Sequence, residues 1–277
     1  MKQNQKTSDV GLHPGHTARK DRQFVTALAR GLEVLRGFAP NEQFLGNQEI
    51  AKRTGLPKPT VSRLTYTLTR LGYLKHSETR GKYALNTGVL SLGYALLANV
   101  SVRQIARPLM QELADYSQGS VAMCARDRLN MVYIENCRSK STVTLSLGVG
   151  SHVSIATTAA GRALMAALPE RERDFLMGHL RRRYPEDWPK INQGMDQALK
   201  DYRQKGFCFS LGDWQKEVNA VGVPLIAAEV SDMLVFTCGG PAFQLRRAKL
   251  EEDIGPRLVN LVRQVEAAAG RDLFVPR

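Results

Sequence analysis

The chain has 277 residues, of which 43% are hydrophobic and 23% are charged, a composition typical of a globular protein that can bury apolar cores. This length predicts two domains. No run of about 18 apolar residues is present, so we expect no membrane-spanning helix, and the N-terminus has no apolar segment typical of a secretion signal.

The net charge of +13 is concentrated in the first third of the chain. Residues 1–90 contain 15 Lys and Arg against 6 Asp and Glu, whereas residues 91–277 contain 24 against 20. A compact segment with excess positive charge is typical of a protein whose partner is a polyanion. Nucleic acid is favoured over a membrane surface, because the sequence has no basic amphipathic helix with Trp or Phe as an anchor.

The chain begins with a polar stretch, residues 1–21, for which we predict a disordered arm. A supporting helix is expected next. Its apolar series, which we expect to pack against the elements that follow, is Val25, Leu28, Leu32, Leu35 and Phe38.

Residues 47–85 predict one complete DNA-binding motif. A short helix is expected over 47–54, a turn over 55–57 and a second helix from about Pro59 to Leu71. Two short strands joined by a turn follow within 72–85. A helix, a tight turn, a helix and a basic hairpin form a winged helix-turn-helix, whose second helix enters the major groove of DNA.

The second helix has one apolar and one polar face. Val61, Leu64, Leu68 and Leu71 recur at spacings of three and four, which predicts a buried stripe. Pro59 suits the first helical position, where its missing N–H costs nothing. A small helical hairpin with a solvated polar face is the alternative, but the basic hairpin and the charge favour DNA. The candidate DNA-binding residues are Lys58, Thr60, Ser62, Arg63, Tyr66, Arg70, Arg80 and Lys82.

Two further helices are expected before the second domain begins. Residues 86–99 predict a linker helix. In the next helix Ser101 and Gln104 have the spacing of a capping box, and Gly119 is expected to end it. The apolar faces of both helices are consistent with pairing of two subunits and equally with packing inside one chain.

After Gly119 the pattern changes to strands bracketed by helices, which predicts an α+β domain with an antiparallel sheet. The expected strands are 121–126, 131–138, 142–147, 207–211, 220–227 and 233–238, and the expected helices are 159–168, 170–182, 193–205 and 243–269.

The four cysteines form no CxxC pair, and we expect buried, reduced thiols in a cytosolic protein. Cys124 and Cys137 fall in neighbouring expected strands and could lie close together. No metal-binding or cofactor-binding motif is recognisable, so no cofactor is expected. No HExxH, nucleophile elbow or P-loop is present, and only His152 and His179 lie in the second domain, so we do not expect an enzyme.

The segment 154–163 is the strongest indication of a ligand site in the second domain. Thr157 or Thr158 can cap a helix whose small residues leave the first backbone N–H groups uncovered, and such a helix start attracts a small carboxylate. A plain capped helix with close-packed small residues is the alternative. The segments 210–214 and 235–241 could face the same site and complete a pocket.

Several segments together resemble the IclR family of bacterial transcriptional regulators, from about Phe24 to Gly270. GLPKPTVSRL (55–64) looks like the start of that family's recognition helix, and GYL (72–74) with YAL (83–85) looks like its wing. TTAAGRALMA (157–166) resembles the effector-domain signature, and GF (206–207) the later glycine-aromatic step. The resemblance implies a GAF-like effector domain, a double-stranded DNA operator, a small organic acid or aromatic catabolite as effector, and a homodimer or tetramer.

In that family the ligand contacts come from the start of the signature helix, the loop after the glycine-aromatic step and the last strand. Carried onto this chain they are Thr157, Thr158, Ala159, Ala160, Ser210, Asp213, Ala220, Thr237 and Gly239. Many members have an acidic pair at the positions of 210–212 and Ser at the positions of Thr237 and Gly239, so the identity of the effector stays open.

We therefore expect a cytoplasmic bacterial transcription factor of α+β class. Its expected parts are an arm (1–21), a winged helix-turn-helix (22–86), a linker helix (87–100) and an effector domain (101–277). Two other classes stay open: a small-molecule enzyme with a fused DNA-binding module, and a DNA-binding protein whose second domain only oligomerises and binds no ligand.

Overall fold

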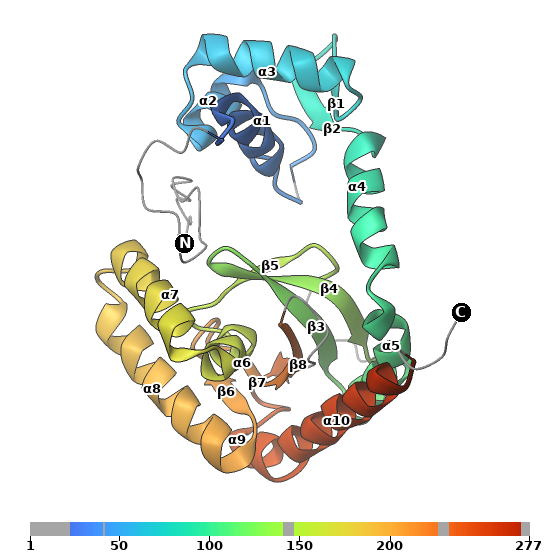
Figure 1. Ribbon diagram of the computed structural model, residues 1–277, viewed down its shortest axis with the longest axis vertical. Coiled ribbons are helices and arrows are strands. Elements are labelled where there is room, and N and C mark those ends of the chain that lie inside the picture. Colours follow the sequence, from blue (N-terminus) through green and yellow to red (C-terminus); the bar gives the residue numbers. More distant parts are fainter. Residues whose placement is uncertain (1–22, 41, 141–146, 227–232, 273–277) are drawn as a thin grey trace. The chain divides into compact units, whose positions relative to one another are not determined.

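The computed structural model describes residues 23–40, 42–140, 147–226 and 233–272 (Figure 1). The chain divides into two compact units, Met1–Asn99 and Val100–Arg277. The predicted arm lies outside the described residues, and so does the predicted strand 142–147 except for its last residue.

The first unit is a winged helix-turn-helix followed by one further helix. Strands β1 and β2 form an antiparallel hairpin, and Leu45 adds a bridge to Tyr83. The buried core joins all three helices of the motif to the hairpin through Val34, Leu45, Ile50, Val61, Leu68 and Leu74. The elements are α1 (Thr26–Arg36), α2 (Asn47–Thr54), α3 (Lys58–Arg70), β1 (Leu74–Ser77), β2 (Lys82–Leu85) and α4 (Thr87–Ala98).

The buried stripe of α3 differs from the predicted one at its end. Leu71 is 63% exposed, because it lies beyond the last helical residue where the chain turns into the wing. Thr65 is fully buried instead, and its hydroxyl donates to the carbonyl of Val61 at 3.0 Å, so its burial leaves no unpaired donor. The helix starts at Lys58, so Pro59 occupies the second helical position.

The expected packing face of α1 was wrong for its first three residues. Val25, Leu28 and Leu32 are 61%, 63% and 50% exposed, whereas Gly31 and Val34 face the core. Helix α4 has no buried residue at all. Its exposed apolar side chains are Leu90, Leu92, Tyr94 and Leu96.

The second unit confirms the α+β class. Its antiparallel sheet has six strands in the order β5-β4-β3-β8-β7-β6. Helices α5 and α10 pack together on one face of the sheet, and α6 lies against the other face with α8 behind it (Figure 1). The elements are α5 (Ser101–Ser117), β3 (Ser120–Asp127), β4 (Asn130–Arg138), β5 (His152–Ser154), α6 (Ala159–Ala167), α7 (Glu170–Arg183), α8 (Trp188–Lys205), β6 (Cys208–Leu211), β7 (Val218–Leu225), β8 (Leu234–Pro241), α9 (Arg247–Lys249), the π-helical turn η1 (Leu250–Ile254) and α10 (Gly255–Asp272).

Several expected boundaries in this unit were wrong. Val100 is the N-cap of α5 and no side chain caps it, so the predicted Ser101 capping box does not form. Gln118 ends α5 in the left-handed conformation, one residue before the expected glycine. Strand β5 was not expected, and the long C-terminal helix is interrupted by the π-helical turn.

An irregularity between β3 and β4 decides which side chains face the pocket described below. Tyr133 pairs with Cys124 and Glu135 pairs with Met123, so Ile134 is an extra residue on β4. A bulge of this kind reverses the alternation of side chains along a strand. As a result Tyr133 reaches the α6 face of the sheet, whereas Glu135 reaches α5 on the opposite face.

Among the described residues no single helix is long and apolar enough to cross a membrane. In that part of the chain, α4 and α5 taken together, as a broken pair, are the one combination that reaches this length and composition.

Candidate functional site

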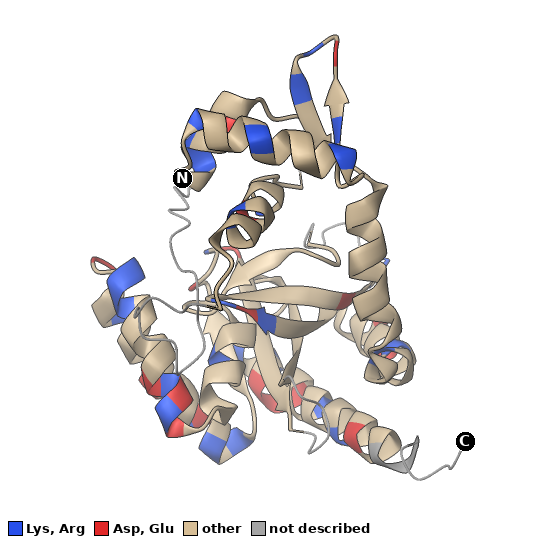
Figure 2. Cartoon of the chain, turned by 45° about the horizontal axis from the view of Figure 1, so that its top comes forward, with Lys and Arg blue, Asp and Glu red and all other residues tan. Residues whose placement is uncertain are grey.

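The polar face of α3 and the wing form the candidate DNA-binding surface. Figure 2 marks Lys and Arg positions along α3 and on the hairpin. Tyr66 is 66% exposed, and Arg63 and Arg70 are also exposed. All eight predicted DNA-binding residues lie on this helix or on the wing, and Thr60 and Lys82 are the partly buried ones. Their contacts with DNA stay a prediction.

The two wing cations differ in their surroundings. Lys82 Nζ lies 3.0 Å from Glu49 Oε2, and the same carboxylate oxygen accepts a hydrogen bond from the Gly46 amide at 2.7 Å. The Gly46 amide, with Lys82, lowers the pKa of Glu49. The Arg80 guanidinium instead lies over the Phe44 ring, 4.5 Å from its centroid. The positive charge of Lys82 is therefore partly offset by the Glu49 carboxylate. The guanidinium of Arg80 is stabilised instead by a cation–π contact with Phe44.

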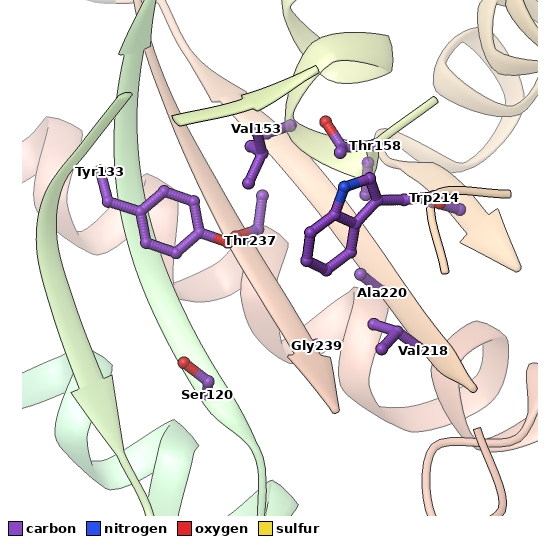
Figure 3. Close-up of a pocket in the computed structure, with 12 residues that line it drawn as sticks. Ser120, Tyr133, Val153, Thr158, Trp214, Val218, Ala220, Thr237 and Gly239 are labelled. Atoms are coloured by element: carbon purple, nitrogen blue, oxygen red, sulfur yellow. The ribbon is translucent and has the colours of Figure 1, made fainter. Parts of the chain in front are cut away.

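The second unit contains a small cavity between the sheet and the start of α6 (Figure 3). Its volume is about 30 Å³. Seven of the nine predicted ligand-binding residues line it, namely Thr158, Ala159, Ala160, Ser210, Ala220, Thr237 and Gly239. The convergence of a helix start, a strand end and a loop is therefore present, although ligand binding by these residues stays a prediction.

Thr157 and Asp213 do not line this cavity. The backbone carbonyl of Thr157 accepts the hydroxyl of Ser210 at 2.8 Å. Asp213 turns away to an ion pair, with its Oδ2 2.8 Å from Nη1 of Arg162. Asp213 thus holds a loop in this structure, rather than facing the cavity.

Sequence reasoning did not name five of the residues that line the cavity as ligand contacts. Trp214 belongs to the segment 210–214, which was expected from the sequence to face the site. It is therefore the one of the five that the sequence could have indicated. The others come from strands β3, β4, β5 and β7, whose approach to α6 depends on the sheet. These residues are Ser120, Tyr133, Val153, Trp214 and Val218.

The start of α6 has the properties of an anion site. Thr158 Oγ1 accepts from the Gly161 amide at 3.1 Å, as a helix cap does. The amides of Ala159 and Ala160 are too early in the helix for an intrahelical acceptor, and both residues line the cavity. A Cβ at Gly161 would lie 2.1 Å from the carbonyl oxygen of Ile155, so only glycine permits this approach.

The hydroxyl groups of the cavity already have partners. Tyr133 and Thr237 lie side by side in the cavity (Figure 3), and burial raises the pKa of Tyr133, so the phenol stays protonated. Ser120 donates to Asn136 Oδ1 at 2.7 Å. No lining residue carries a charged side chain, so the cavity offers an anion only amides, hydroxyls and the helix dipole.

Neither metal chemistry nor redox chemistry is indicated for the part of the chain that the structure describes. No group of three His, Cys, Asp or Glu side chains there could hold a metal ion. All four cysteines are free and buried, and burial raises the pKa of each thiol. Cys124 and Cys137 are not neighbours, because Cys124 pairs with Tyr133 across β4 and Cys137 with Val121.

The chain combines a winged helix-turn-helix with an α+β domain that contains a small pocket at a helix start. This combination is typical of a DNA-binding regulator that senses a ligand. Residues 27–78 match the IclR helix-turn-helix domain, and residues 94–267 match the C-terminal domain of the bacterial transcriptional regulator IclR. The chain belongs to the IclR family of bacterial transcriptional regulators. It is a DNA-binding regulator with an effector-binding domain and not an enzyme, which removes the fused-enzyme alternative.

Several relatives are similar over almost the whole chain. The HTH-type transcriptional regulator TsaQ1/TsaQ2 of Comamonas testosteroni is 34% identical over 245 residues, 88% of each chain. The crystal structure of an IclR family transcriptional regulator from Brucella abortus is 52% identical, with a TM-score of 0.86 over 97% of this chain and all of that one. An IclR homologue from Microbacterium hydrocarbonoxydans complexed with 4-hydroxybenzoate shares the fold, with a TM-score of 0.70, 18% identity and coverage of 88% and 99%.

Proposed function

We propose that this protein is a cytoplasmic homodimer that binds a pseudopalindromic operator and whose affinity for that operator changes when a small carboxylic acid binds at the start of α6. The observation that carries the proposal is the cavity at Ala159 and Ala160, where backbone amides of a helix N-terminus meet an apolar wall.

The DNA-binding part of the proposal is supported by the surface of α3. Arg63 and Tyr66 project away from the buried residues Val61 and Leu68. A recognition helix with an exposed Arg and Tyr on its outer face can donate to base edges and to phosphates. The basic wing extends the same surface along the DNA backbone.

Two apolar surfaces of the first unit support a dimer. Helix α4 is apolar nearly all round and yet has no buried residue. Val25, Leu28 and Leu32 form a second exposed apolar row on α1. Contiguous exposed apolar surface in a globular protein marks an interaction site, and a second copy of the chain would bury both faces.

A carboxylic acid suits the cavity better than other small molecules. The amides of Ala159 and Ala160 and the positive end of the α6 dipole favour an anionic group. The lining has no lysine or arginine that would favour phosphate or a second carboxylate. The Microbacterium homologue bound to 4-hydroxybenzoate, which is an aromatic monocarboxylate, has the same fold.

The experiment that tests the proposal joins the two sites. Genomic DNA fragments captured by the full-length protein are sequenced to define the operator, and operator affinity is then measured with and without carboxylates. The effector should change operator affinity, and operator DNA should change effector affinity by the same factor, because linkage is reciprocal. Operator binding that no carboxylate alters, together with no thermal stabilisation by any of them, would favour a second domain that binds no ligand.

A further inference from the structure

The cavity is too small for an organic effector as it stands. Its volume of about 30 Å³ has room for about two or three water molecules. Pockets that enclose organic ligands measure about 300–1,000 Å³. One of the walls must therefore move before an effector can enter.

Trp214 is the wall that can move most easily. Tyr133, Thr237 and Ala160 are 8%, 6% and 2% exposed and belong to the sheet or to α6. Trp214 is partly exposed and lies in the loop between β6 and β7. Figure 3 shows its indole lying over the site on the side opposite Tyr133.

Trp214 lines the cavity and carries a hydrogen-bond donor, its indole N–H. This group is not among the buried side-chain donors that lack a partner in the described residues. An oxygen of a bound effector would give it an acceptor inside the cavity.

The base of the Trp214 loop is anchored to a buried arginine. Arg162 is 8% exposed, and its Nη1 donates to the carbonyl of Phe209 and to Oδ2 of Asp213, each at 2.8 Å. The same Oδ2 accepts the amide of Leu211 at 3.2 Å. Asp213, the residue directly before Trp214, thus links this loop to helix α6.

Arg162 itself has little freedom to move. A Cβ at Gly194 on α8 would lie 2.4 Å from its Nη2, so the guanidinium packs directly against that helix. Rotation of Arg162 would also leave Asp213 without its cation in a mostly buried setting, which is costly. The Arg162–Asp213 ion pair is therefore expected to stay in place, while the part of the β6–β7 loop beyond it can change its conformation.

We propose, on the basis of the carboxylate function proposed above, that Trp214 is the residue that recognises the planar part of the effector. Arg162 and Asp213 are positioning residues that present the indole to the start of α6. On binding, the indole rotates out of the cavity and packs against the effector, while the carboxylate of the effector meets the amides of Ala159 and Ala160.

This arrangement selects a class of effector. One end of the site accepts a single negative charge, and no cation is available for a second one. The other end presents an aromatic face, which favours an aromatic ring through stacking as well as burial. We expect aromatic monocarboxylates to bind more tightly than aliphatic acids of similar size and more tightly than aromatic dicarboxylates.

The first test uses Trp214 as its own reporter. The chain has two tryptophans, so Trp188→Phe leaves Trp214 as the single fluorophore. Titration of this full-length variant with benzoate and with 4-hydroxybenzoate should give a saturable change in tryptophan emission, with the same Kd as the thermal stabilisation measured in parallel. Stabilisation without a change in emission would overturn the role of Trp214 and leave the proposed function intact. Absence of both for every carboxylate would instead count against the proposed function.

The second test separates recognition from positioning. Trp214→Ala should weaken benzoate binding about tenfold, since both the aromatic pairing and the apolar area buried against the indole are lost. Propionate binding should change less than about twofold, because propionate has no ring to stack. Trp214→Phe should recover most of the affinity for benzoate.

Asp213→Asn should reproduce part of this loss and also shift the emission of Trp214 in the free protein, because the loop loses its ionic anchor. Glu217→Gln, an exposed change of the same charge in the same loop, is the matched control and should leave both unchanged. Circular dichroism and the melting temperature identify any variant that fails to fold. Wild-type affinity for benzoate in folded Trp214→Ala would overturn the proposal.

Discussion

Glu135 and Arg103 form an ion pair whose carboxylate is buried, with Nε of Arg103 2.7 Å from Oε2 of Glu135. The second oxygen of Glu135 lies 2.7 Å from Nη1 of Arg107. Both arginines belong to α5, and Glu135 lies two residues after Tyr133 on β4. One strand therefore lines the cavity at the start of α6 on one face of the sheet and is bound ionically to α5 on the other.

This cluster predicts a graded loss of stability. The side chain of Arg103 is 32% exposed and that of Arg107 is 59% exposed. Arg103→Met should lower the free energy of unfolding by about 1–2 kcal/mol and Arg107→Met by less than about 1 kcal/mol, because the more exposed charge is better screened by water. Urea unfolding of the full-length protein measures both. Equal losses of stability in the two variants would contradict the premise that the exposure of each arginine determines how much its ion pair contributes.

DNA binding by residues 22–85 should be strongly salt-dependent. The basis is the excess of Lys and Arg in the first 90 residues. If roughly six to ten phosphates are contacted, operator affinity should fall about 10³- to 10⁵-fold between about 50 and 200 mM salt. Fluorescence anisotropy with labelled duplex checks this. An affinity that ignores salt would contradict a phosphate-dominated interface.

Arg63→Ala and Tyr66→Ala should weaken operator binding without unfolding the protein, because both side chains are exposed on α3. A good base contact is worth about 1–3 kcal/mol, and its loss should relax specificity at one base pair. Selection from a randomised operator reads out that relaxation. Normal specificity in both variants would show that another face of α3 reads the DNA.

The wing should contribute sequence-independent affinity. Arg80→Ala and Lys82→Ala should weaken all duplexes alike. Glu49→Gln should do the opposite and strengthen binding to any duplex, since it removes the charge that offsets Lys82 while its amide oxygen can still accept from Gly46. Competition assays with unrelated DNA measure these changes, and unaltered affinity in Glu49→Gln would mean that Lys82 does not approach a phosphate.

Ala160→Leu should abolish effector binding while operator binding persists. Ala160 is 2% exposed and lines the cavity, so a larger side chain fills the space at the helix start. A ligand at about one hundred times its Kd should stabilise the wild-type protein by about 2.7 kcal/mol. Thermal unfolding of the variant should show no such gain. A full thermal response in the variant would remove the start of α6 from the effector site.

The thiols should make the protein less stable at alkaline pH. Burial raises the pKa of Cys208 to about 12 and that of Cys238 to about 11, and an exposed thiol in the unfolded chain titrates near about 8.5. The folded state disfavours the thiolates. The stability that the buried, protonated thiols contribute is therefore fully present below about pH 8.5 and is lost as the pH rises towards these pKa values. Urea unfolding as a function of pH tests this, and Cys238→Ser provides a comparison. A flat profile between about pH 8.5 and 11 would contradict it.

The DNA-binding motif could be derived from the sequence because its determinants are local. The turn at 55–57 and the spacing of Val61, Leu64 and Leu68 gave α2 and α3 to within a residue. Helix periodicity shows that a helix is amphipathic, but the partner decides which neighbouring residues are buried. For that reason Leu71, Leu28 and Leu32 were expected inside and lie exposed.

A helix start capped by Thr157 or Thr158 was also predicted from the sequence, and the structure has the cap at Thr158. It was predictable because a capping residue followed by Ala and Gly acts within one turn of backbone. The remaining walls of the cavity depended on the tertiary structure. Tyr133 faces it only because Ile134 is an extra residue on β4. Asp213 is drawn away from it by Arg162, and Trp214 takes the place beside it. These outcomes follow from strand register and from a charge pair between residues far apart in the sequence, and no local pattern encodes either.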